Sequence, residues 1–110
     1  MKPAAMKPDA MPSEDEVRAA LRGVLDPEAG MNVVDLGLVY GIDVSERLVR
    51  VTMTMTTPAC PMGDLITGNA REAVRALVPE GVEVDVPLVW EPPWTPAMMS
   101  DGARRHFGWN

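Results

Sequence analysis

The sequence contains little of what disulfide-bonded, metal-binding and membrane-spanning proteins require. Its 110 residues include one cysteine and one histidine. A single cysteine excludes an intramolecular disulfide framework, and it also excludes a metal site built from the cysteines of one chain. No apolar run is long enough to span a bilayer, and residues 1–12 lack the apolar core of a secretory signal. We therefore predict a cytoplasmic protein whose lone thiol stays reduced.

Basic residues are also scarce. Ten Lys and Arg residues stand against 16 Asp and Glu residues, which gives a formal net charge of −6. A protein that grips nucleic acid through the phosphate backbone needs a basic face, and an electrostatic anchor on anionic lipid needs a basic cluster. The charge balance therefore argues against nucleic acid and membrane surfaces as partners.

The remaining composition is that of one ordinary soluble domain. Hydrophobic residues make up 46% of the chain and charged residues 24%, both near the average for globular proteins. Residues 1–12 are rich in Ala, Met, Lys and Pro, and their prolines interrupt any helix. We predict a flexible leader over residues 1–12 and a single domain over residues 13–110.

Three helices are predicted. The first begins at Ser13, which has the capping-box spacing to Glu16, and it is predicted to end at Asp26-Pro27 because the residue before proline avoids helical geometry. The second runs over residues 61–77, and a short third helix carries Ala103. Apolar residues recur at helical spacing in the first two, at Val17, Ala20, Leu21 and Val24, and at Ile66, Ala70, Ala73, Val74 and Leu77.

Three strands are predicted from alternating apolar and polar residues over 35–44, 49–56 and 82–90. A sheet with one apolar face is covered by helices on one side only. The predicted fold class is therefore α/β (α+β), a two-layer sandwich with a small three-stranded sheet and helices on one face. The predicted element order is α-β-β-α-β-α.

Cys60 is the first candidate for chemistry. Pro61 follows it at the start of the second predicted helix, where proline is favoured, so Cys60 falls near the N-cap. Backbone N–H groups and the helix dipole at such a site lower the pKa of a thiol from about 8.5 and favour the thiolate, which is both nucleophile and metal ligand. The alternative is a buried structural cysteine that acts as a small hydrophobe.

Carboxylates supply the other candidates. Asp26 and Glu28 flank Pro27 in a rigid loop, where they could bind a cation or orient a thiol, or simply form a helix-terminating turn. Asp35 opens a predicted strand, where aspartate is unfavourable, so it either caps a loop or faces the cysteine. His106 is predicted to complement the dipole of the last helix.

Two further features have structural and functional interpretations. Trp90 and Trp94, with the prolines between them, could form an aromatic docking surface or wedge a loop onto the core. The row of Thr52, Thr54 and Thr56 is predicted to form a flat polar face that is solvated or that pairs across a dimer.

Several ordered motifs resemble one known family. They are Asp26-Pro27-Glu28, the stretch Asn32-Val33-Val34-Asp35-Leu36-Gly37-Leu38-Val39, then Thr57-Pro58-Ala59-Cys60-Pro61-Met62-Gly63, and Val89-Trp90-Glu91-Pro92-Pro93-Trp94-Thr95-Pro96. In this order they resemble the SufT/PaaD-like family of metal-sulfur cluster biosynthetic proteins, over nearly everything after residue 13. The family's signature residues map onto Asp26, Glu28, Asp35, Thr57 and Cys60. The chain ends without the C-terminal cysteine-rich zinc segment of the PaaD branch, so it resembles the single-domain SufT-type branch.

The resemblance implies the fold of the iron–sulfur cluster assembly domain and a role in assembling clusters or delivering them to client apoproteins. It implies the iron–sulfur assembly machinery as a partner, and a cluster or iron held transiently through Cys60. Clusters need about four thiolate or substitute ligands, so one chain alone cannot bind one tightly. The other ligands would come from a second chain in a homodimer, a small thiol or a partner.

Two alternatives remain for function. The chain could be a thiol-dependent enzyme with Cys60 as nucleophile and Asp26 or Glu28 moving protons, which the lack of a nearby histidine in the sequence weakens. It could instead be a passive adaptor in a multi-component complex, such as a phenylacetate-type oxygenase pathway, with the Trp94 loop binding a partner. Of these three functions, we expect that of an assembly factor rather than that of an enzyme with turnover.

Overall fold

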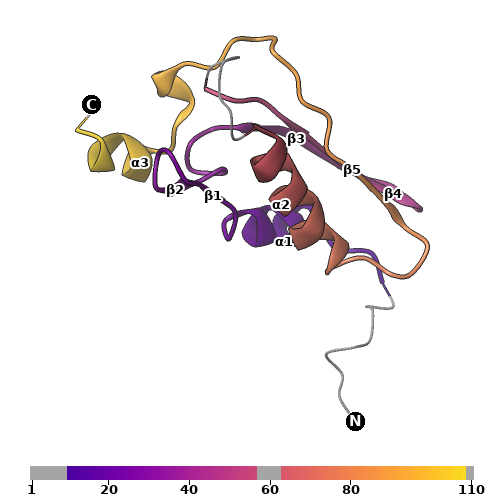
Figure 1. Ribbon diagram of the computed structural model, residues 1–110. Coiled ribbons are helices and arrows are strands. Elements are labelled where there is room, and N and C mark those ends of the chain that lie inside the picture. The colour runs from indigo at the N-terminus through magenta and orange to yellow at the C-terminus, as the bar shows by residue number, and fades with distance from the viewer. Residues whose placement is uncertain (1–9, 57–62, 109–110) are drawn as a thin grey trace.

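The computed structural model describes residues 10–56 and 63–108, and Figure 1 shows how their elements are arranged. A one-turn 3-10 helix, Pro96–Met98, precedes the last helix. The other elements, in chain order, are α1 (Glu14–Leu21), β1 (Leu25–Asp26), β2 (Met31–Asn32), β3 (Val39–Val44), β4 (Leu48–Met53), α2 (Gly63–Arg75), β5 (Glu83–Asp85) and α3 (Asp101–His106).

The main sheet has three strands in the order β3-β4-β5. β3 and β4 pair antiparallel as a hairpin, and β5 pairs parallel to β4 after the crossover through α2. Both α1 and α2 lie on the same side of this sheet (Figure 1). This arrangement confirms the predicted two-layer fold with helices on one face.

The core lies between the sheet and these two helices. Val49, Val51 and Met53 of β4 are fully buried, because a strand turns every second side chain toward the same face. The predicted apolar stripes of the helices supply the opposite wall with Val17, Leu21, Ile66, Ala70 and Val74, all fully buried. Burial of each large aliphatic side chain contributes about 1.5–3 kcal/mol, so this layer dominates the stability of the domain.

The predicted start of α1 is confirmed and its predicted end is wrong. Glu16 N donates to Ser13 Oγ at 3.1 Å, and Ser13 N donates to Glu16 Oε1 at 2.8 Å, which completes the capping box. The helix ends at Leu21, five residues before Asp26, and Pro27 lies in the turn that follows β1. Sequence patterning missed this boundary because Val24 keeps the helical spacing and is buried, although it lies beyond the helix.

All three main strands are shorter than predicted, and the second, β4, ends at Met53 instead of at residue 56. The first main strand begins at Val39, because the preceding residues form a turn that uses Gly37 at φ +80°. The third, β5, is confined to Glu83–Asp85. Beyond it, Leu88 and Trp90 are 36% and 40% exposed, so the predicted apolar face ends there.

The C-terminal segment docks on the turn before β3. Trp94 Nε1 donates to the carbonyl oxygen of Leu36 at 2.7 Å, and Tyr40 Oη donates to that of Pro92 at 2.6 Å. A Cβ on Gly37 would lie 2.7 Å from the carbonyl carbon of Met98, so only glycine permits this approach. Trp94 thus wedges its loop onto the core, as one of the two interpretations predicted.

No helix among residues 10–56 and 63–108 has the length and apolar character needed to cross a membrane.

Candidate functional site

A short hairpin that the sequence patterns did not reveal connects two of the predicted site residues. β1 and β2 pair antiparallel, with Leu25 opposite Asn32 and Asp26 opposite Met31. Paired residues in such a ladder have Cα atoms about 4.5–5.5 Å apart. The hairpin therefore joins the Asp26-Pro27-Glu28 loop to the segment that leads into Asp35.

Asp26 organises the turn of this hairpin. It is 3% exposed, and its Oδ1 accepts a hydrogen bond from the backbone N–H of Glu28 at 2.9 Å. Its carbonyl oxygen accepts from the N–H groups of Ala29 at 3.1 Å and Gly30 at 2.8 Å. The side-chain bond is an Asx turn, by which aspartate nucleates a loop, and the two backbone bonds close that loop. Glu28 is exposed at its tip.

Asp35 is held by Asn32. The Asn32 Nδ2 group donates to Asp35 Oδ2 at 2.8 Å, and Asp35 N donates to Asn32 Oδ1 at 2.9 Å. The carbonyl oxygen of Asp35 also accepts from Ser100 N at 2.8 Å. Asp35 thus lies in a turn that Asn32 caps, instead of opening a strand, and its carboxylate is held by the amide of Asn32.

Cys60 and Thr57 lie outside the described residues, as does the predicted helix start at Pro61. The described part of α2 begins at Gly63, three residues after Cys60 in the sequence. Gly63 itself is buried, and the next residue, Asp64, places a carboxylate in the first turn of the helix. The position predicted for Cys60 at the N-cap therefore remains a prediction.

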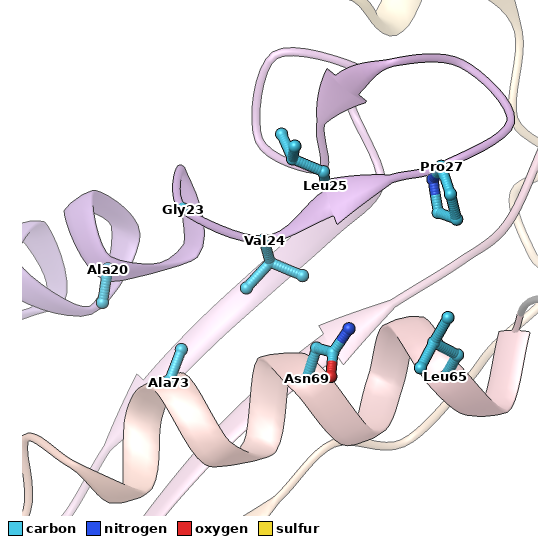
Figure 2. Close-up of a pocket in the computed structure, with 8 residues that line it drawn as sticks. All are labelled: Ala20, Gly23, Val24, Leu25, Pro27, Leu65, Asn69 and Ala73. Atoms are coloured by element: carbon cyan, nitrogen blue, oxygen red, sulfur yellow. The ribbon is translucent and has the colours of Figure 1, made fainter.

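An apolar groove runs between α2 and the segment that joins α1 to the hairpin. Its volume is about 600 Å³. Figure 2 shows Val24 and Pro27 pointing toward α2, while Leu65, Asn69 and Ala73 point back toward them from the helix. Because Pro27 lines this groove, the groove borders the loop that carries Asp26 and Glu28.

The other predicted features have structural roles where they are described. His106 is in the last turn of α3, with its ring edge-on to Phe107 at 5.0 Å between centroids. Thr54 is 1% exposed, so the threonine row is not a continuous solvated face. Within residues 10–56 and 63–108, no three His, Cys, Asp or Glu side chains form a cluster that could hold a metal ion.

Sequence reasoning missed two residues of this region. Asn32 opens the family motif over residues 32–39, but its position in the sequence does not identify it as the partner of Asp35. That contact depends on the turn between the two residues. Leu65 fell outside the predicted buried stripe of α2 and is 48% exposed. A large apolar residue on the solvent side of an amphipathic helix was the available signal.

Fold and sequence comparisons together define the class of protein. A profile of the iron–sulfur cluster assembly protein family matches residues 14–86. The "Fe-S protein maturation auxiliary factor YitW" of Bacillus subtilis is 40% identical over 86% of this chain and 93% of its own length. The "Fe-S protein maturation auxiliary factor SufT" of Staphylococcus aureus is 44% identical over 77% and 97%, respectively. The crystal structure of a domain of unknown function from Bacillus anthracis superposes with a TM-score of 0.81, at 39% identity over 88% of this chain and 92% of that one.

The chain therefore belongs to the iron–sulfur cluster assembly protein family. This confirms the resemblance to the single-domain SufT-type branch, since the chain covers more than nine-tenths of both relatives. The solved structure confirms the α+β architecture.

Proposed function

We propose that the chain is a maturation factor that helps deliver iron–sulfur clusters to client apoproteins through the Cys60 thiolate. The observation that carries this proposal is the near full-length similarity to two proteins named as Fe-S protein maturation auxiliary factors. The cluster, or iron, is cargo that passes through the protein. The partners are the assembly machinery that supplies the cargo and the apoproteins that receive it.

The chemistry of Cys60 limits how the cargo is held. One thiolate provides about a quarter of the ligands that a cluster needs. The remaining ligands come from outside the chain: a second copy, a small thiol or a partner protein. Transient binding suits a delivery factor, because a cluster held by few ligands is easily passed on.

We assign the carboxylates supporting roles. Asp26 shapes the hairpin turn through its bond to Glu28 N, and Glu28 sits exposed at that turn. Asp35 is fixed by Asn32. Thr57, three residues before Cys60 in the sequence, completes the set. In this proposal the carboxylates accept the proton that the Cys60 thiol loses when it binds iron.

An anaerobic loading experiment tests this function. The purified protein is incubated with ferrous iron, sulfide and a small thiol, and protein-bound iron and sulfide are measured after desalting. Wild type is expected to acquire both, in an assembly containing more than one chain or a bound thiol, and to pass them to an apoferredoxin. Cys60→Ser is expected to acquire neither. Equal loading of Cys60→Ser would overturn the proposal.

The reactivity of the thiol supplies a second test. An N-cap cysteine should alkylate with iodoacetamide at neutral pH faster than free cysteine, because a larger fraction is thiolate. A rate equal to that of free cysteine, or slower, counts against an activated Cys60.

A further inference from the structure

The chain beyond β5 continues along β4 as the outer edge of the main sheet. Glu83 N donates to the carbonyl oxygen of Arg47 at 2.9 Å. Further along, Met53 N donates to Pro87 O at 3.0 Å, and Val89 N donates to Met53 O at 2.8 Å. These bonds keep the whole segment in register with β4. Among the described residues, no strand pairs with the other side of β5, since the sheet order is β3-β4-β5.

Leu88 and Trp90 turn their backbone groups away from the sheet. Successive residues of a strand direct their N–H and C=O groups to alternate sides. Because Pro87 and Val89 bond inward to Met53, Leu88 and Trp90 face outward. In the part of the chain that the structure describes, the backbone of neither residue forms a hydrogen bond. The edge therefore offers N–H donors and C=O acceptors at strand spacing.

The side chains of these two residues are apolar and exposed. By alternation they continue the row of Val84 and Val86 past the end of the buried core. Val84 and Val86 are 6% and 5% exposed, whereas Leu88 is 36% and Trp90 40% exposed, so the edge opens at Leu88. Trp94 wedges its loop onto the core, but Trp90 stays at the surface, where the docking interpretation fits it.

An open edge of this kind is a pairing site unless it is protected. Natural edge strands are protected by proline, by charged side chains or by a covering helix or loop. The outward-facing positions here hold Leu88 and Trp90, and Pro87 offers no protection because its backbone faces β4. The occupant that satisfies such an edge is an extended chain, whose main-chain bonds give affinity and whose alternate side chains give specificity.

We propose that residues 88–90 bind an extended segment of another protein by strand addition, and that apolar side chains at alternate positions of this segment pack over Leu88 and Trp90. A second copy of this chain is the less suitable occupant. So short a free edge is far below the roughly 20–30 residues per side of a stable interface. It suits a partner that binds briefly and leaves.

That this partner is a client or a cluster donor rests on the proposed function. Leu88 pairs with Met53 at the end of β4, and the chain continues from there toward Cys60, seven residues further in the sequence. A segment added at this edge would lie one strand beyond β4, the strand that leads toward the thiol. Strand addition would then hold the partner protein while the cargo is transferred.

Peptide binding to ¹⁵N-labelled protein tests the edge directly. The probe is acetyl-Thr-Leu-Thr-Val-Thr-amide, which has apolar side chains at two alternate positions. It is expected to shift the amide signals of Leu88 and Trp90 and to slow hydrogen exchange at both, because their N–H groups become bonded. Shifts that map elsewhere, or no shift at millimolar peptide, would overturn the proposal.

Methylated peptides separate strand addition from simple apolar contact. Methylation of the Leu and Val nitrogens keeps both side chains and is expected to weaken binding about tenfold, since the peptide loses two hydrogen-bond donors. Methylation of the second and third Thr nitrogens, which would face away from the edge, is the matched control and is expected to leave affinity unchanged. Equal binding of the two methylated peptides would overturn the proposal.

Substitutions in the protein locate the binding. Trp90→Ser and Leu88→Ser are each expected to weaken the peptide about fivefold, since each removes exposed apolar area. Leu25→Ser, at an exposed leucine outside this edge, is the matched control and is expected to leave affinity unchanged. Unchanged affinity in both edge variants, or equal weakening in all three, would overturn the proposal. Concentration-dependent shifts of the edge amides without peptide would assign the edge to a second copy and would also overturn it.

Failure of this proposal is distinguishable from failure of the proposed function. If Cys60→Ser loads iron and sulfide as well as wild type while the peptide still pairs with the edge, the function is wrong and the docking surface stands. If Cys60→Ser fails to load while no peptide binds, only the docking surface is wrong.

Discussion

The Asn32 side chain and Asp35 form a reciprocal pair, in which the Asn32 amide donates to the Asp35 carboxylate at 2.8 Å and its oxygen accepts from the Asp35 backbone at 2.9 Å. Asn32 belongs to β2, whose partner strand contains Asp26. The pair therefore ties the turn before β3 to the hairpin that holds the first candidate carboxylate. It makes these two regions of the candidate site one structural unit.

Removing that pair should loosen the turn. Asn32→Ala is expected to lower the free energy of unfolding by about 1–3 kcal/mol, because it leaves partly buried polar groups of Asp35 without their partners. Urea unfolding followed by circular dichroism measures the change. Ser45→Ala, which removes an exposed side-chain bond to Leu48 O, is the control and should change stability by less than about 0.5 kcal/mol. Equal effects of the two substitutions would contradict a special role for Asn32.

The Trp94 indole should contribute through its hydrogen bond as well as its packing. Trp94→Phe keeps an aromatic ring but removes the donor to Leu36 O, and it is expected to cost about 1 kcal/mol. Trp90→Phe, at a side chain that is 40% exposed, is expected to be close to neutral. The midpoints of urea unfolding compare the two. A neutral Trp94→Phe would show that packing alone holds the loop.

Gly37 and Gly81 separate backbone strain from crowding. Both have positive φ, at +80° and +85°, but a Cβ on Gly37 meets the Met98 backbone while one on Gly81 meets nothing within 4 Å. Gly81→Ala should cost about 1–2 kcal/mol from strain alone. Gly37→Ala should cost at least about 1 kcal/mol more, since overpacking adds to the strain. Thermal unfolding of both variants measures the difference, and equal losses would argue against close docking of the C-terminal segment.

Thr54 offers a substitution that should not destabilise the domain. Its Oγ1 is buried and has no hydrogen-bond partner in the part of the chain that the structure describes. Thr54→Val replaces that hydroxyl with a methyl group of similar size, so stability should stay equal or rise by up to about 1–2 kcal/mol. A loss of more than about 1 kcal/mol in urea unfolding would show that the hydroxyl is bonded in solution.

Periodicity predicted the layers of the fold but not its short elements. The stripe on α2 and the alternation on β4 are repeated signals, and both became core. The β1–β2 hairpin has two residues in each strand, too few for an alternation to be visible. Its formation depends on the Asp26 turn and on Gly30 at φ +68°, which are local bonds rather than patterns.

The candidate site was predictable only as a set of residue types. Asp26, Glu28 and Asp35 were recognised from motifs, and Asp35 was predicted either to cap a loop or to face the cysteine. Which partner caps it could not be predicted, because Asn32 reaches it only after the chain turns. The groove was invisible for the same reason, since its walls come from segments about 40 residues apart.

The most direct test of the central claim is the activity of iron–sulfur enzymes in a strain whose own copy of this protein is replaced by Cys60→Ser. Extracts are assayed for an iron–sulfur hydro-lyase before and after chemical reconstitution with iron and sulfide, and the purified variant is checked for unchanged unfolding. If Cys60 delivers clusters, activity is as low as in a deletion strain and is restored by reconstitution. Wild-type activity before reconstitution, in cells that hold normal amounts of the variant, would contradict it.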